Sequence, residues 1–164
     1  MPDSAISVII MQCTRLLKEA FEGPPGPWSY FTDRSPEAGL LGTIDRLSAA
    51  AASRPSGSGA STIAGHVQHL VSSLALSVRW MQGQPIARDR TQSWTVYAVD
   101  DPAWTKLRQE LRRAYQSLFI AIETERDWDE DALGGAMGAI AHAAYHLGAI
   151  RQRLGREVKA TRES

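Results

Sequence analysis

Apolar residues recur three and four positions apart over several long segments of this chain, and this spacing limits the folds open to it. An α-helix has about 3.6 residues per turn, so residues spaced in this way line one helix face. The pattern predicts a first helix from about Asp3 to Glu22, with an apolar row of Ile6, Ile9, Ile10, Cys13, Leu16, Leu17, Ala20 and Phe21. Such a helix is stable when its apolar face packs against other helices.

Prolines, glycines and serines mark where this helix ends and where connections follow. Residues 23–27 hold three prolines and end the first helix, because proline lacks a backbone donor and clashes with the preceding turn. An ordered loop is expected over Trp28–Pro36, with its aromatic residues lying over the bundle. A shorter helix then has one apolar side, made of Leu40, Leu41, Ile44 and Leu47. The serine- and glycine-rich stretch Ser53–Ala60 indicates a flexible connection.

A second long helix is predicted after this connection. Ser61 or Thr62 is expected to cap it, because a hydroxyl can accept a bond from the first turn of a helix. The helix should continue to about Gly83. A long connection over residues 84–101 follows, and within it we expect a short extended piece over residues 94–99.

Two more long helices complete the pattern. Asp101 and Pro102 open the third, with the carboxylate at the cap and proline in the first turn. Its apolar row consists of Trp104, Leu107, Leu111, Ala114, Leu118 and Ile122. The acidic run over residues 127–131 ends with the cap of the last helix, where negative charge favours the helix dipole. This helix should reach about Gly155.

Four long helices without a convincing strand pattern predict an all-α fold. We expect an antiparallel four-helix bundle with an extra short helix and long loops. The chain of 164 residues is the size of one domain with its own core, so residues 1–164 are expected to form a single helical-bundle domain.

Charge and cysteine content narrow the classes of function. Lys+Arg and Asp+Glu both number 18, and this balance argues against a nucleic-acid partner, which would favour a basic surface. No apolar run approaches the roughly 20 residues of a membrane span, so no membrane partner is expected. Cys13 is the single cysteine, which leaves no intrachain disulfide and favours a core role for this residue. The start of the chain lacks the features of a secretory signal, so a cytoplasmic location is expected.

The histidines are the residues most able to carry chemistry. His142 and His146 lie four positions apart, so they project from one face of the last helix and can reach one metal ion. Gly134 and Gly138 occupy the same row, which leaves room beside the histidines or lets a partner helix pack closely.

A second pair, His66 and His69, lies on the second long helix. The main apolar stripe of that helix is made of Ile63, Val67, Leu70, Leu74, Val78 and Met81, and His66 lies nearer its centre. His69 belongs to a second row that also holds apolar residues, so either histidine could face inward. The pattern alone does not choose between them.

These two histidine motifs resemble those of the DinB/YfiT-like superfamily of four-helix metalloproteins. In that family the second helix carries a metal-binding histidine just before an apolar residue, and the last helix carries two histidines four positions apart, followed by glycine. The matching segments here are residues 62–70 and 141–148. By this resemblance the metal ligands are His69, which precedes Leu70, together with His142 and His146.

Two positions depart from the family pattern. Ser72 stands where the family often has aspartate three residues after the ligand, and Ala149 stands where glutamine is common. The first departure removes a carboxylate from the expected surroundings of the metal. The second removes an amide that would orient a ligand.

Three histidines leave coordination positions of a metal ion open for water or substrate, as in catalytic sites. The donor set does not choose among zinc, nickel, manganese and iron. The resemblance implies a divalent-metal-dependent enzyme acting on a small molecule, and we favour thiol-dependent transfer or isomerisation with a low-molecular-weight thiol. The alternatives are a metal-dependent hydrolase and a non-catalytic, stress-related metal-binding bundle.

The resemblance also implies a homodimer. Aromatic residues of the predicted loops are expected either to join its interface or to cover the site: Trp28, Tyr30, Phe31, Trp94 and Tyr97.

Overall fold

A computed structural model of the chain describes residues 4–35, 37–55, 61–84, 94–125 and 127–162. Within these ranges the chain forms helices α1 (Ser4–Phe21), α2 (Leu40–Asp45), α3 (Ala49–Ala52), α4 (Ile63–Met81), α5 (Asp101–Thr124) and α6 (Glu130–Arg162). Connections 56–60 and 85–93 lie outside the described residues, and so do the side chains beyond residue 155.

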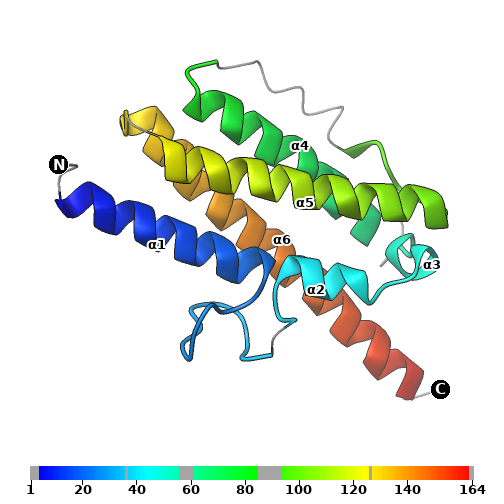
Figure 1. Cartoon of the computed structure of the whole chain (residues 1–164). Coiled ribbons are helices and arrows are strands. Elements are labelled where there is room, and N and C mark those ends of the chain that lie inside the picture. Colours follow the sequence, from blue (N-terminus) through cyan, green and yellow to red (C-terminus); the bar gives the residue numbers. More distant parts are fainter. Residues whose placement is uncertain (1–3, 36, 56–60, 85–93, 126, 163–164) are drawn as a thin grey trace.

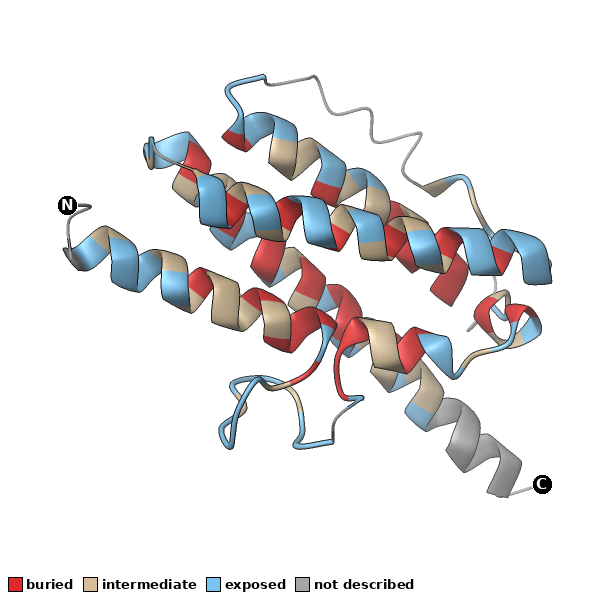
Figure 2. Ribbon diagram, in the orientation of Figure 1, coloured by how far each residue is buried: buried red, intermediate tan, exposed pale blue. Residues whose placement is uncertain are grey.

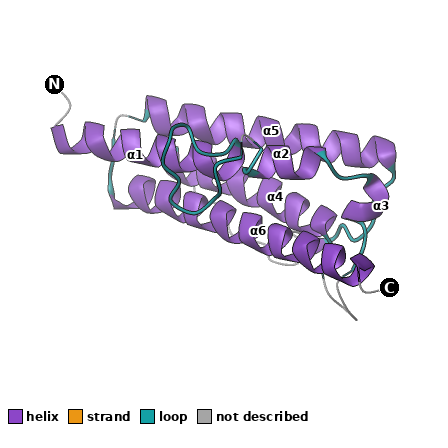
Figure 3. Cartoon of the chain, turned by 90° about the horizontal axis from the view of Figure 1, so that it is seen from below, coloured by secondary structure: helices purple, strands orange, loops and turns teal. Residues whose placement is uncertain are grey.

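The four long helices α1, α4, α5 and α6 form one bundle, as the sequence predicts (Figure 1). Helix α4 packs against both α5 and α6, and α1 packs against the same two helices. The short helices α2 and α3 extend along α5 toward one end of the bundle (Figure 3). The single short helix expected after residue 39 is therefore two helices, separated by residues 46–48.

The four long helices run in two opposite directions, two helices in each. Helices α1 and α6 run one way along the bundle, and α4 and α5 run the other way (Figure 1). The connection from Met81 to Asp101 therefore brings the chain back to the end where α4 begins. Contacts near its end agree with this path, because the carbonyl oxygen of Val96 lies against Gly65 in the first turn of α4.

The core lies where the apolar rows of the long helices meet (Figure 2). Its largest fully buried side chains include Trp104, Phe21, Leu17, Leu40, Ile44, Leu70, Leu74, Leu111, Leu118, Ile122 and Ile150. The predicted apolar rows are thus largely confirmed. An exception on α1 is Ile9, which is exposed. Within the described ranges, no helix is both long enough and apolar enough to cross a membrane.

Side-chain caps precede three of the long helices, and two of these caps lie earlier in the chain than predicted: that of α5 by one residue, and that of α6 at Asp129 and not at the end of the acidic run. The Thr62 hydroxyl accepts a hydrogen bond from the backbone N–H of Gly65 at 3.1 Å and caps α4. Helix α5 is capped by Asp100 and not by Asp101, which is its first helical residue. The Asp129 carboxylate accepts a hydrogen bond from the backbone N–H of Ala132 at 2.8 Å, in the first turn of α6. Helix α6 continues past the expected end at Gly155 to Arg162.

A buried carboxylate organises the loop after α1. Glu19 is fully buried, and its Oε1 accepts hydrogen bonds from the hydroxyl of Ser29 at 2.7 Å and from the backbone N–H groups of Tyr30, Phe31 and Thr32 at 2.8 to 3.1 Å. The loop is therefore held by its backbone. The expectation that its aromatic side chains lie over the bundle is met by Phe31, which lines an apolar groove with residues of α1 and α6. Trp28 is 71% exposed, and Tyr30 is 61% exposed with its ring beside Arg15 of α1.

Burial and hydrogen bonding act on the pKa of Glu19 in opposite directions. Burial raises the pKa, but the hydrogen bonds from Phe31, Ser29 and Thr32 outweigh it and hold the pKa below its ordinary value. A carboxyl with a lowered pKa in the folded state stabilises the protein above its unfolded pKa. That contribution is lost as the pH falls through the folded value.

Replacement Glu19→Gln should lower the free energy of unfolding by roughly 2 to 4 kcal/mol at pH 7, because the uncharged amide accepts weaker hydrogen bonds and places an NH2 donor where Oε2 now accepts from the Tyr30 N–H. Urea denaturation of both proteins at pH 7 and near pH 3 measures the loss, which should shrink in acid. As a control, Glu37→Gln removes an exposed ion pair with Arg46 and should change stability by less than about 1 kcal/mol. A loss for Glu19→Gln that does not depend on pH would contradict this role.

Candidate metal centre

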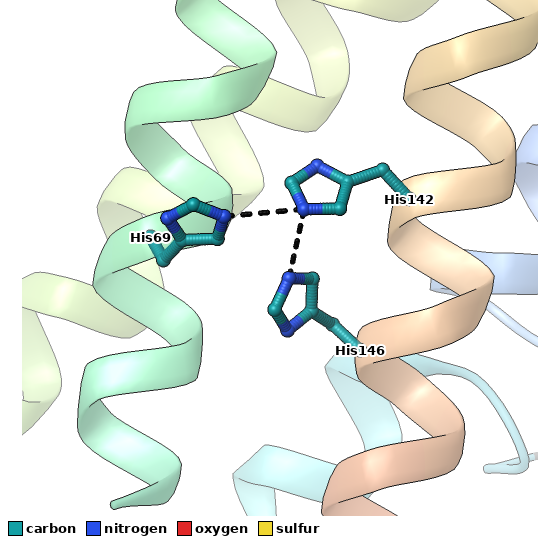
Figure 4. A group of neighbouring side chains, drawn as sticks. All are labelled: His69, His142 and His146. Carbon is teal, nitrogen blue, oxygen red and sulfur yellow. Dashed lines mark hydrogen bonds between the residues drawn. The ribbon is translucent and has the colours of Figure 1, made fainter. Parts of the chain in front are cut away.

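The packing of α4 against α6 brings all four histidines into one cluster. His66 and His69 come from the first half of α4, and His142 and His146 come from the middle of α6. Each pair is about one helical turn apart, so both members face the neighbouring helix. In Figure 4 the rings of His69, His142 and His146 point toward one another in the space between the two helices.

Three ring nitrogens converge within this cluster. His142 Nε2 lies 3.1 Å from His69 Nε2 and 2.9 Å from His146 Nε2 (Figure 4). One ligand atom from each of the three residues lies within 4.8 Å of the other two. The group therefore unites the three histidines that the resemblance implies as ligands.

The arrangement fits a small divalent cation. Ligand nitrogens of a tetrahedral site lie about 3.3 Å apart when each metal–nitrogen bond is about 2.0–2.1 Å long. The nitrogen separations of 2.9 and 3.1 Å are slightly shorter and would widen by a few tenths of an ångström around an ion. Neutral imidazole is a good ligand for zinc, nickel and iron alike, so the donor set leaves the metal unnamed.

Burial keeps the imidazoles of His146 and His66 neutral. His146 is 2% exposed, and burial together with the nearby His142 and His66 lowers its pKa to about 3. The pKa of His66 is lowered to about 4, again mainly by burial. Both rings are therefore uncharged at pH 7, which is the form that binds a metal or accepts a hydrogen bond.

Trp94 covers one side of the cluster. Its indole stacks on the His69 ring at 4.4 Å between centroids, and it makes a T-shaped contact with the His66 ring at 5.3 Å. The loop aromatics were expected either to join a dimer interface or to cover the site, and Trp94 covers the site. Tyr97 remains 59% exposed.

Gln68 and Gly65 place Trp94 there. The Gln68 side chain accepts hydrogen bonds from the backbone N–H of Thr95 and Val96, and its amide donates to the Thr95 hydroxyl. A Cβ at Gly65 would meet the Val96 carbonyl oxygen at 2.9 Å, so only glycine allows this close approach. The expected extended piece is irregular chain held against α4, with no strand in residues 94–99.

A groove of about 330 Å³ between α4 and α6 ends beside His142. From α4 it is lined by Ser73, Leu76, Ser77 and Trp80, and from α6 by Gly134, Gly135, Gly138, Ala139 and His142. A Cβ at Gly134 or Gly138 would meet no other atom within 4 Å, whereas one at Gly135 would contact Met81. Gly134 and Gly138 thus leave open space, and the backbone at Gly135 lies at ordinary contact distance from Met81.

Comparison with known proteins agrees with the fold and the cluster. The family model described as the DinB superfamily matches residues 33–150, which is well over half of the chain. The chain belongs to the DinB superfamily. The match includes all four histidines and leaves out α1. No curated protein and no solved structure gave a match to this DinB protein.

Ser72 stands at the position where the resemblance led us to expect an aspartate beside the metal. Ser72 is exposed and donates a hydrogen bond to the carbonyl oxygen of Gln68 on its own helix. It does not contribute to the histidine cluster. Residues that contact the cluster include Trp94 and Ser61, and Gln68 holds the chain next to Trp94. No periodicity pointed to these residues, because their contacts depend on where the connections lie.

Proposed function

We propose that this DinB protein is a divalent-metal-dependent enzyme that acts on a small molecule bound in the groove between α4 and α6. The observation that carries the proposal is the convergence of three histidine nitrogens at the end of that groove. His142 belongs to both features, so a molecule in the groove would lie next to the ion held by His69, His142 and His146.

When bound, a divalent ion would supply an open coordination position and lower the pKa of a thiol or water placed there. The protein's own part is to hold the ion with neutral imidazoles, to cover one side with Trp94 and to position the second reactant in the groove. The three-histidine set is compatible with zinc, nickel, manganese or iron.

We favour thiol transfer over hydrolysis. The groove residues named above include two serines but no carboxylate, so an attacking water would have no acidic side chain there to take its proton. A thiol has a lower pKa than water and needs no such base. In the transfer, a sulfur–carbon bond forms, the leaving group departs with its bonding electrons, and the thiol proton passes to solvent.

A non-catalytic metal-binding bundle is the second candidate. The observation that favours it is the exposed Ser72 at the family's carboxylate position, which leaves the site without that acid. Assays of thiol consumption with an electrophile such as 1-chloro-2,4-dinitrobenzene, with and without added metal, separate this candidate from the enzyme. A cytoplasmic location, where low-molecular-weight thiols are kept reduced, is part of the transfer proposal.

Variants His69→Ala, His142→Ala and His146→Ala should each lose most bound metal and all metal-dependent thiol consumption, because two imidazoles hold an ion far more weakly than three. Elemental analysis of protein purified without an affinity tag, beside the thiol assay, measures both effects.

His66→Ala is the comparison variant, since it removes a neighbouring histidine outside the triad: it should weaken binding without abolishing it and keep more metal than any of the three triad variants. Full metal content in His69→Ala together with loss in His66→Ala would show that the wrong member of the α4 pair was assigned.

We also propose that two copies of the chain pair through α1 and α6. These helices form an apolar groove of about 590 Å³ lined by residues such as Val8, Ile9, Leu16, Met137 and Ile140, and none of the lining residues is charged. Val8 and Met137 are 50% and 58% exposed. A two-fold interface sets the same patch against itself, so an uncharged patch avoids like-charge repulsion.

Light scattering at micromolar concentration should therefore give twice the chain mass of 17.9 kDa. Met137→Glu should shift the protein toward monomer, because a buried interface charge is costly. Ile120→Glu, at an equally exposed position on α5 outside this groove, is the control and should stay dimeric. A wild-type mass of 17.9 kDa would refute the pairing.

A further inference from the structure

The fourth histidine makes a specific contact behind the triad. His66 is 7% exposed, and its Nδ1 lies 2.7 Å from Nδ1 of His146. A bond between two ring nitrogens needs one protonated donor and one unprotonated acceptor. Which ring donates depends on what each ring does with its other nitrogen.

For His146, the geometry of the cluster determines which ring nitrogen carries the proton. Its Nε2 faces His142 and the point where the triad converges, so a metal ion there would need that nitrogen unprotonated. A neutral imidazole carries one proton, which would then sit on Nδ1 of His146. His146 becomes the donor to His66, and Nδ1 of His66 must accept.

The same reasoning extends one step outward. If Nδ1 of His66 accepts, its proton is on Nε2, which lies 3.2 Å from the Ser61 hydroxyl. Arg153 donates to that hydroxyl at 3.2 Å and also bonds the Ser61 carbonyl oxygen. Guanidinium can only donate, and a hydroxyl oxygen has two lone pairs, so Ser61 can accept from both neighbours. Each hydrogen bond from His146 through His66 to Ser61 and Arg153 therefore has one donor and one acceptor when Nε2 of His146 is free to bind a metal ion.

We propose that His66 is a positioning residue that fixes the tautomer and ring orientation of the ligand His146, with Ser61 and Arg153 fixing His66 in turn. The inference rests on the proposed metal site. Metal-bound histidines usually donate their second N–H to a carboxylate, a backbone carbonyl or water. Here an uncharged imidazole takes that place, and Trp94 packs edge-on against it.

A structural role for His66 predicts something different. Were His66 only filling the core, a side chain of similar shape would serve equally well, with or without an acceptor. His66→Phe keeps a ring of similar size and removes the acceptor. His66→Asn is smaller but places its amide oxygen near the position of Nδ1, where it can still accept from His146.

The test measures zinc dissociation constants by competition with a chromophoric chelator, and visible spectra of cobalt-loaded protein. His66→Phe should bind one ion per chain about 10- to 100-fold more weakly than wild type, with an altered cobalt spectrum. His66→Asn should recover most of the affinity and the wild-type spectrum. Ser61→Ala leaves His66 in place and should weaken binding less than His66→Phe does.

Wild-type affinity and spectrum in His66→Phe would overturn the proposal, and so would an equal loss in the Phe and Asn variants. If His66→Phe fails to fold, the cobalt spectra of His66→Asn and Ser61→Ala decide. An altered spectrum of His66→Asn together with a wild-type spectrum of Ser61→Ala would then contradict the positioning role. Failure of the metal site itself shows differently, because wild-type protein would then bind no zinc.

Discussion

The antiparallel contact between α4 and α6 is the constraint on which the site depends. His69 on one helix and His142 and His146 on the other are brought together only because these two helices lie side by side at this register. A slide by one helical turn, about 5.4 Å, would separate the nitrogens that now lie 2.9 and 3.1 Å apart. The same contact forms the groove beside His142, since glycines of α6 face serines of α4 there.

Much of this arrangement was accessible from the sequence because it depends on local spacing. The four long helices follow from apolar rows, and the pairing of His142 with His146 follows from the helical repeat. The choice between His66 and His69 was not accessible in this way. It depends on how α4 is rotated against α6, and the observed rotation buries both histidines, with His66 7% and His69 6% exposed.

The positions of several loop side chains could not be predicted from the sequence, because they depend on tertiary contacts. The loop after α1 is anchored by the buried Glu19 carboxylate, which leaves Trp28 and Tyr30 exposed. Trp94 reaches His69 because Gln68 holds the backbone of the returning connection. At the start of α5, Asp101 was predicted as the cap, but the N–H of Ala103 donates to the carboxylate of Asp100.

The central claim is that three imidazoles of this DinB protein hold one divalent ion, and X-ray absorption at the zinc edge of zinc-loaded protein tests it most directly. The account predicts three imidazole nitrogens at about 2.0–2.1 Å and a further light ligand at the open position. In protein prepared without added thiol, a first shell containing sulfur, or one with fewer than three imidazoles, would contradict the account.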